Sequence, residues 1–191
     1  MRLLVVGIDG ATFRIIKPLC NQGELPTLDK LIRKGVHGVL ESTFPPLTGP
    51  AWTAIATGKN PGKTSVYDFM NLANKRNFKI KYLNSYDIKK AGTYWDYLSK
   101  SGFRVGIINY PFLYPPYEIN GVMVSGIGCT PQDEITYPKE FKQVLINKCN
   151  GKYRIDVPWH SSEYFNNPSK FIDDIFDLLD INYKTIETVL D

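Results

Sequence analysis

The feature that most constrains this chain is the fully apolar run from Leu3 to Ile8, which ends in the sequence Gly7-Ile8-Asp9-Gly10. A short run of this kind, rich in β-branched residues, is typical of a central strand in a parallel sheet. It is far shorter than the roughly 20 apolar residues of a membrane-spanning helix, and Asp9 interrupts it too early for a secretory signal. We therefore expect a cytoplasmic α/β protein in which Asp9 lies at the carboxyl edge of the sheet, where such folds bind ligands.

Composition indicates one globular domain with a sizeable core, since the chain has 191 residues of which 43% are hydrophobic and 22% charged. Three cysteines (Cys20, Cys129 and Cys149) are an odd number without CxxC spacing, which favours reduced thiols over disulfides or a zinc ribbon. Two histidines, His37 and His160, are too few to build a metal centre by themselves. We interpret His37, which lies between glycines without a carboxylate or second histidine near it in sequence, as a structural residue.

The pattern of apolar residues and capping signals predicts alternating helices and strands. After the first strand we expect helices over residues 12–20, 26–34, 48–57, 93–101, 138–148 and from 168 onward, and further strands over 36–41, 104–109 and 121–125. In the last helix we expect Ile172, Ile175, Leu179, Ile186 and Val189 to form the apolar face. Residues 59–90 are basic, polar and aromatic without a clear period, and we expect them to form a surface excursion.

Two short motifs resemble nucleotide-binding loops but lack the right context. Residues 58–64 (GKNPGKT) are one residue too short between their glycines for a Walker A loop, and they follow a predicted helix rather than a strand. The Gly126-Ile127-Gly128 sequence follows a predicted strand, but Pro131 replaces the third glycine of a dinucleotide fingerprint. We expect ordinary loops at both places.

Residues 75–90 carry six cations against Asp87, together with the aromatic residues Phe78, Tyr82 and Tyr86. Such a stretch can bind a nucleic-acid strand by neutralising phosphates and stacking on bases. A solvated surface with anchoring aromatics is the commoner origin of a charge run. Neither a nucleic acid nor a membrane is therefore an expected partner.

Asp9 and Thr48 can contribute to one metal- and phosphate-binding site. A carboxylate at the end of the first strand is a hard oxygen ligand for a divalent metal, although a lone Asp there is more often a loop cap. Thr48 falls where a helix N-cap belongs, and unpaired N–H groups at such a position favour anions, although a lone Thr there is simply a cap. Gly49 lets a phosphate approach the backbone closely. Thr53, by contrast, is expected to donate its hydroxyl to the carbonyl of the preceding helical turn.

These residues belong to a longer resemblance. Residues 5–13 (VVGIDGATF), Leu25 to Leu28, Gly35 and residues 44–69 (FPPLTGPAWTAIATGKNPGKTSVYDF) resemble the type I phosphodiesterase/nucleotide pyrophosphatase family of the alkaline phosphatase superfamily. The resemblance implies a three-layer α/β/α sandwich with a largely parallel sheet. It also implies a two-metal centre, usually of zinc, with Asp9 as a metal ligand and Thr48 as both the nucleophile and a ligand. The implied substrate is a small-molecule phosphodiester, pyrophosphate or related phosphate ester.

The family's remaining metal ligands, an Asp and several His residues, have no counterparts in the sequence. We therefore expect residues 1–191 to be the N-terminal portion of a single alkaline-phosphatase-like catalytic domain, incomplete at its C-terminus and inactive alone. The alternative is a non-catalytic phosphate-binding domain that lacks the metal site. Which ester is bound, the identity of the metal and the oligomeric state stay open.

Overall fold

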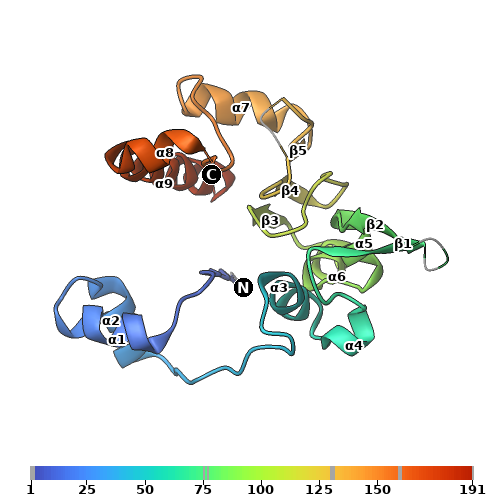
Figure 1. Ribbon diagram of the computed structural model, residues 1–191, viewed down its shortest axis with the longest axis horizontal. Coiled ribbons are helices and arrows are strands. Elements are labelled where there is room, and N and C mark those ends of the chain that lie inside the picture. The colour runs from blue at the N-terminus through green and yellow to red at the C-terminus, as the bar shows by residue number, and fades with distance from the viewer. Residues whose placement is uncertain (1–2, 75, 77, 130–131, 159–160, 191) are drawn as a thin grey trace. The chain divides into compact units, whose positions relative to one another are not determined.

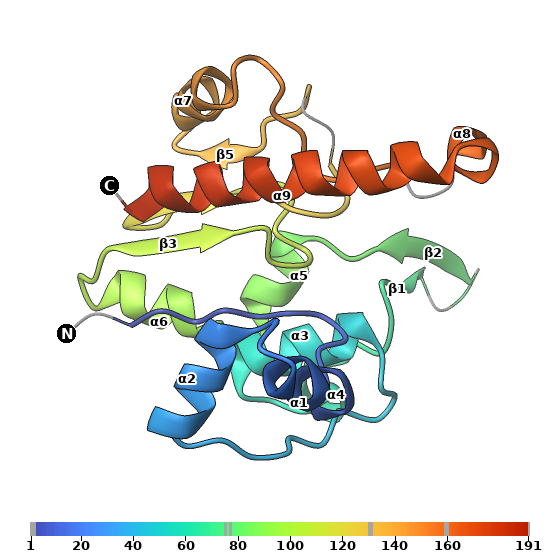
Figure 2. The ribbon, with the colours of Figure 1, turned by 90° about the vertical axis from the view of Figure 1, so that its left-hand side faces the viewer.

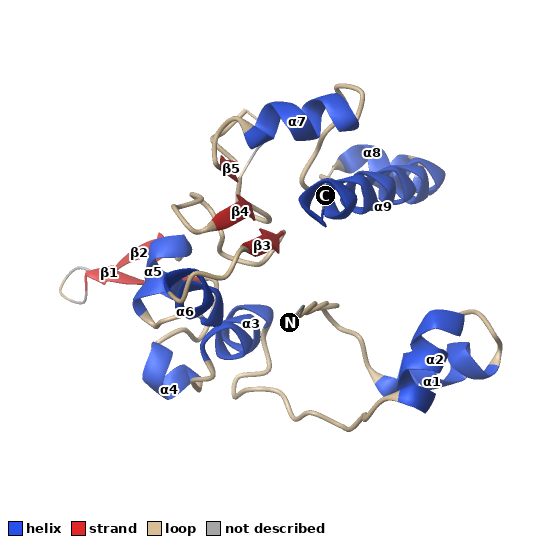
Figure 3. Ribbon diagram, turned by 180° about the vertical axis from the view of Figure 1, so that it is seen from behind, coloured by secondary structure: helices blue, strands red, loops and turns tan. Residues whose placement is uncertain are grey.

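The computed structural model describes residues 3–74, 76, 78–129, 132–158 and 161–190. His160 and Pro131, which entered the sequence hypotheses, lie outside these residues. The chain divides into two compact units, Met1–Ser42 and Thr43–Asp191, and each is described by itself. Figures 1 and 3 label the helices and the short strands along the chain.

The first unit contains two helices whose ends match the capping signals in the sequence. Helix α1 (Phe13–Asn21) begins at Thr12, whose Oγ1 accepts a hydrogen bond from the Arg14 amide at 3.3 Å. Helix α2 (Pro26–Lys34) ends at Gly35, whose amide donates to the Leu31 carbonyl at 2.8 Å. The His37 ring contacts the edge of Phe13 at a centroid distance of 5.9 Å, in keeping with a structural role for this histidine.

The two strands predicted in the first unit do not form, so this part of the sequence prediction is wrong. Residues 3–8 and 36–41 are irregular, and the side chains of Val6 and Val36 are 71% and 104% exposed. A strand is stabilised by hydrogen bonds and packing against neighbouring strands, which an apolar pattern cannot supply. Among the described residues of this unit there is no other strand to pair with them.

The second unit begins with helices α3 (Thr48–Thr57) and α4 (Pro61–Thr64), followed by the antiparallel strands β1 (Met70–Asn74) and β2 (Lys79–Tyr82). Helices α5 (Ser85–Lys90) and α6 (Tyr94–Lys100) come next. Residues 59–90 thus hold two short helices and a hairpin. They also supply buried residues, among them Val66 and Ile88, so the excursion is partly anchored in the core.

A three-stranded sheet follows, formed by β3 (Val105–Ile108), β4 (Gly121–Val124) and β5 (Thr136–Tyr137) in that order. Strands β3 and β4 are parallel, and β5 is antiparallel to β4. The mixed α/β class is therefore confirmed. The largely parallel sheet of a three-layer sandwich is not reproduced, because the described residues form only small sheets with one parallel pair.

Three helices complete the unit: α7 (Phe141–Lys148), α8 (Ser162–Asn166) and the long α9 (Pro168–Leu190). Helix α9 runs alongside β3 (Figure 2), so closely that a Cβ built on Gly106 would lie 2.6 Å from Val189 Cγ1. Its buried positions include Ile181 and Thr185. Of the residues predicted to form the apolar face, Ile172, Leu179 and Ile186 are exposed.

Two clusters of buried side chains form the core of the second unit. One surrounds Trp95 and Tyr110 and joins α3, α6 and the sheet, and the other surrounds Leu145 and Ile181 between β4, α7 and α9. The three cysteines are free thiols, as predicted. In the part of the chain that the structure describes, no helix combines the length and apolar character that a bilayer crossing requires.

Candidate functional site

Thr48 is the first residue of helix α3 rather than its N-cap. The N-cap is Leu47, which has extended backbone angles and makes no side-chain capping hydrogen bond. The prediction that Thr48 is the N-cap is therefore wrong by one residue, within the usual uncertainty of helix ends. Thr48 nevertheless lies half-buried in the first turn, where backbone N–H groups have no acceptor within the helix and negative charge is favoured.

Gly49 is buried and packs directly against another segment of the chain. A Cβ built on it would lie 3.0 Å from the Asp68 carbonyl oxygen and 3.1 Å from Phe112 Cζ. The absence of a side chain therefore lets the first turn of α3 approach Asp68 and Phe112 closely. Close packing therefore explains why residue 49 is a glycine. That the backbone amide of Gly49 also binds a phosphate stays a prediction.

Three threonines near Thr48 in the sequence donate their hydroxyls to backbone carbonyls. Thr53 is fully buried, and its Oγ1 donates to the Gly49 carbonyl at 2.8 Å. The predicted role of this side chain is thus confirmed. Thr57 donates to the Thr53 carbonyl at 2.7 Å, and Thr43 to the Pro45 carbonyl at 2.9 Å.

Aromatic side chains hold helix α3 from one side. The Tyr110 hydroxyl donates to the Trp52 carbonyl, and the Tyr110 ring meets Trp52 and Trp95 edge-on at centroid distances of 5.0 and 4.9 Å. Burial raises the pKa of Tyr110 far above its usual value. The Tyr110 side chain therefore stays a neutral phenol. Its hydrogen bond to Trp52 holds the helix that carries Thr48, and it adds no charge near that residue.

Asp9 belongs to the first unit, whereas Thr48 belongs to the second. Asp9 is exposed and lies in a turn in which the Ala11 amide donates to the Ile8 carbonyl at 3.4 Å, with Gly10 at a φ of 68°. That Asp9 and Thr48 share one cleft stays a prediction.

The two predicted donors do not by themselves complete a metal site. A zinc site takes about four ligands, and Asp9 with Thr48 supplies two. Over residues 3–190, leaving aside the undescribed gaps, no three or more His, Cys, Asp or Glu residues come together as a metal site would require. The described residues therefore supply only part of the donor set of the metal pair that the family resemblance implies, and no reaction step is routed through such a pair.

Sequence reasoning missed a buried polar contact at the carboxyl end of β3. Asn109 follows β3 with a φ of 53°, and its Nδ2 donates to Asn182 Oδ1 of α9 at 2.8 Å. Its Oδ1 is buried without a hydrogen-bond partner among the described residues. An Asn at the last position of a predicted strand was the available signal, since asparagine tolerates left-handed backbone angles at strand exits. The pairing with Asn182, 73 residues away, had no local signal.

Taken together, these observations define a mixed α/β protein that presents a threonine in the anion-favouring first turn of a helix. The chain belongs to the Type I phosphodiesterase / nucleotide pyrophosphatase family, whose model matches residues 3–188. This confirms the resemblance found in the sequence. Searches of curated proteins and of solved structures gave no match to the chain.

Proposed function

We propose that this protein hydrolyses phosphodiester or pyrophosphate bonds of a small-molecule phosphate ester, with Thr48 as the nucleophile. Membership of the phosphodiesterase/pyrophosphatase family supports the reaction class. The observation that carries the assignment of Thr48 is its place in the first turn of α3. A phosphate is stabilised there by the partial positive charge of the helix end.

The proposed chemistry has two balanced steps. In the first, Thr48 Oγ1 forms a bond to phosphorus, the bond to the leaving oxygen breaks, and the hydroxyl proton ends on the leaving group. In the second, a water oxygen bonds to phosphorus, the bond to Oγ1 breaks, and a proton returns to Thr48. The backbone amides of the first turn, including that of Gly49, would hold the phosphoryl oxygens through both steps.

Two finer parts of the proposal rest on family membership. The first is that the complete fold is an alkaline-phosphatase-like sandwich. The second is that Asp9 and Thr48 are donors to divalent metal ions, for which zinc is the proposed identity. Since the described residues do not complete a metal site, the two steps above assign roles only to residues of this chain.

The test compares Thr48→Ala with Thr53→Ala in protein expressed from the complete reading frame and supplied with Zn²⁺. Turnover of bis(4-nitrophenyl) phosphate and mass spectrometry of a trapped phosphothreonine are the two readouts. Thr48→Ala should lower turnover by at least ~100-fold and abolish the phosphothreonine, because it removes the attacking oxygen. Thr53→Ala should act through stability, because its hydroxyl is committed to the Gly49 carbonyl.

A Thr48→Ala enzyme with full activity, or a phosphothreonine at position 53, would show that the nucleophile is assigned to the wrong residue. Circular dichroism of both variants controls for folding. It also separates a loss of chemistry from a loss of structure.

A further inference from the structure

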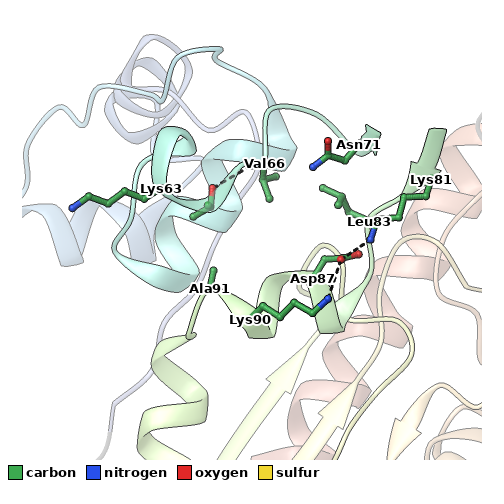
Figure 4. Close-up of a pocket in the computed structure, with 9 residues that line it drawn as sticks. Lys63, Val66, Asn71, Lys81, Leu83, Asp87, Lys90 and Ala91 are labelled. Carbon is green, nitrogen blue, oxygen red and sulfur yellow. Dashed lines mark hydrogen bonds and ion pairs between the residues drawn. The ribbon is translucent and has the colours of Figure 1, made fainter. Parts of the chain in front are cut away.

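A pocket of about 320 Å³ opens between helices α4 and α5 and the β1–β2 hairpin, and we call it the α4–α5 pocket. Figure 4 shows its lining residues, which come entirely from the second unit. They are Lys63, Thr64, Val66, Asn71, Lys81, Leu83, Asp87, Lys90 and Ala91. The volume lies at the lower end of the range of small-molecule sites, roughly 300–1,000 Å³.

The charge of this pocket is unbalanced, with three lysines against one aspartate. The ammonium groups of Lys81 and Lys90 lie 2.6 and 3.9 Å from the same atom, Asp87 Oδ1 (Figure 4). The two ammonium nitrogens are therefore no farther apart than the sum of these distances. A single carboxylate cannot neutralise both, so one positive charge is left over where the two side chains converge.

Asp87 is fixed in this position by its helix. Its Oδ2 accepts a hydrogen bond from the Asn84 amide at 3.2 Å, as part of the capping box at the start of α5. Only 14% of the Asp87 side chain is exposed. The carboxylate therefore keeps the Lys81 ammonium, which donates to it at 2.6 Å, at the pocket wall, and the exposed Lys90 side chain brings a second ammonium within 3.9 Å of the same oxygen.

The other lining residues indicate which kind of anion the pocket can bind. Thr64 and Asn71 are hydrogen-bonding residues, whereas Val66 and Leu83 are buried apolar residues. A phosphate group has enough oxygens to accept from two ammonium groups at once, and a compact organic remainder could cover the apolar wall. The pocket is also larger than a bare inorganic ion requires.

We propose that the α4–α5 pocket binds a small organic phosphate, with its phosphoryl group between Lys81 and Lys90. The site is separate from Thr48, and the proposal does not depend on the function assigned to that residue. Lys63 lines the pocket with its stem, but in Figure 4 its ammonium end points away from Asp87. Lys63 is therefore a minor contributor to phosphate binding.

The experiment titrates the ¹⁵N-labelled protein, in EDTA, with inorganic phosphate and with phenyl phosphate, and follows amide chemical shifts. Shifts should concentrate at Thr64, Asn71, Lys81 and residues 87–91. Phenyl phosphate should bind several-fold more tightly than inorganic phosphate, because its own apolar ring would leave water beside Val66 and Leu83. Because this arm uses the unmodified protein, no variant has to fold for the proposal to be tested.

Calorimetric titration of variants gives the second arm. Lys81→Gln and Lys90→Gln should each raise the dissociation constant of phenyl phosphate ~5- to 10-fold. Lys63→Gln should have less effect. Lys100→Gln, the same change at an exposed position in the last turn of α6, should have none.

Four results would overturn the proposal. Shifts confined to Gly49 and Ala51 would place the phosphate at the first turn of α3 instead, and an absence of saturable shifts would mean that the pocket binds no phosphate. Equal weakening by Lys100→Gln would indicate non-specific attraction to net charge. A single-stranded oligonucleotide that binds through Phe78 and Tyr82, while phenyl phosphate does not bind, would assign the basic surface to nucleic acid.

Discussion

Replacing Tyr117 by Phe is a direct test of the buried hydrogen-bond network that supports helix α6. The Tyr117 hydroxyl accepts from Trp95 Nε1 at 2.8 Å and donates to Asp96 Oδ2 at 3.3 Å. Trp95 and Tyr117 are 1% and 5% exposed, so water does not readily replace the lost oxygen. Asp96 keeps its 2.6 Å bond from Thr93 Oγ1, and the helix cap should therefore persist in the variant.

The expected cost follows from what the variant leaves unpaired. A buried N–H without an acceptor costs about 1–3 kcal/mol, and the lost bond to the carboxylate adds to this. We expect Tyr117→Phe to lower the free energy of unfolding by about 2–3 kcal/mol. For a chain of this length that corresponds to a decrease in Tm of roughly 5–10 °C.

Urea denaturation followed by tryptophan fluorescence measures this change, because Trp95 itself lies in the network. Tyr82→Phe is the matched control, since Tyr82 is 75% exposed and its hydroxyl change should cost less than ~0.5 kcal/mol. If Tyr117→Phe is as stable as Tyr82→Phe, the network contributes nothing measurable and the reasoning is wrong.

Alkaline pH provides an independent check on the same residue. Burial raises the pKa of Tyr117 to about 12, whereas an unfolded tyrosine titrates near 10. The unfolded state therefore loses its proton first, and this stabilising contribution is full below pH ~10 and falls by up to ~2.7 kcal/mol towards pH ~12. Burial also raises the pKa of Tyr110 and Tyr153, so wild type and Tyr117→Phe should both lose stability at alkaline pH. Only wild type loses the contribution of Tyr117, so the difference between their free energies of unfolding should narrow over this range. A gap that stays constant would contradict the assignment.

The remaining predictions concern a strand end and an ion pair. Gly121→Ala should lower the free energy of unfolding by about 3 kcal/mol, because Gly121 has a φ of 144° and a Cβ there would overlap backbone atoms of Val105. Gly62→Ala is the control in the same denaturation assay, since a Cβ on Gly62 would have its nearest contact at 3.4 Å. Hydrogen bonds from Tyr164 and then Arg154 lower the pKa of Asp174, so its stabilising contribution should be present above pH ~4 and lost as the pH falls further. In acid titrations Asp174→Asn should show a weaker dependence of stability on pH than wild type, and identical curves would exclude this contribution.

Several helix ends were predictable because their signals are local, although the start of α3 was predicted one residue too late. Thr12, Gly35 and Gly58 each mark a helix end through a hydrogen bond or backbone conformation set by the residue itself and its immediate neighbours. The same holds for Thr53, whose hydroxyl acceptor is four residues away. Such contacts depend on the geometry of a single helix and need no knowledge of the rest of the fold.

Strand pairing and helix facing were harder because they depend on distant partners. Residues 3–8 have the composition of a buried strand, but composition does not provide a neighbouring strand. In α9, apolar residues occur on more than one face, and close contact with Gly106 selects the face that packs on β3. The Asn109–Asn182 bond likewise depends on the position of α9 over the sheet, which no local pattern encodes.

The segment of residues 66–72 contacts both the first turn of α3 and the α4–α5 pocket. Gly49 packs against the Asp68 carbonyl, the Phe69 carbonyl accepts from the Leu83 amide at 3.0 Å, and Asn71 lines the pocket. A ligand that displaces this segment from either side therefore also changes the surroundings of the other. Thermodynamic linkage then requires reciprocity: if a phosphate in the pocket changes the affinity of the α3 turn for its ligand by some factor, that ligand changes the affinity of the pocket by the same factor.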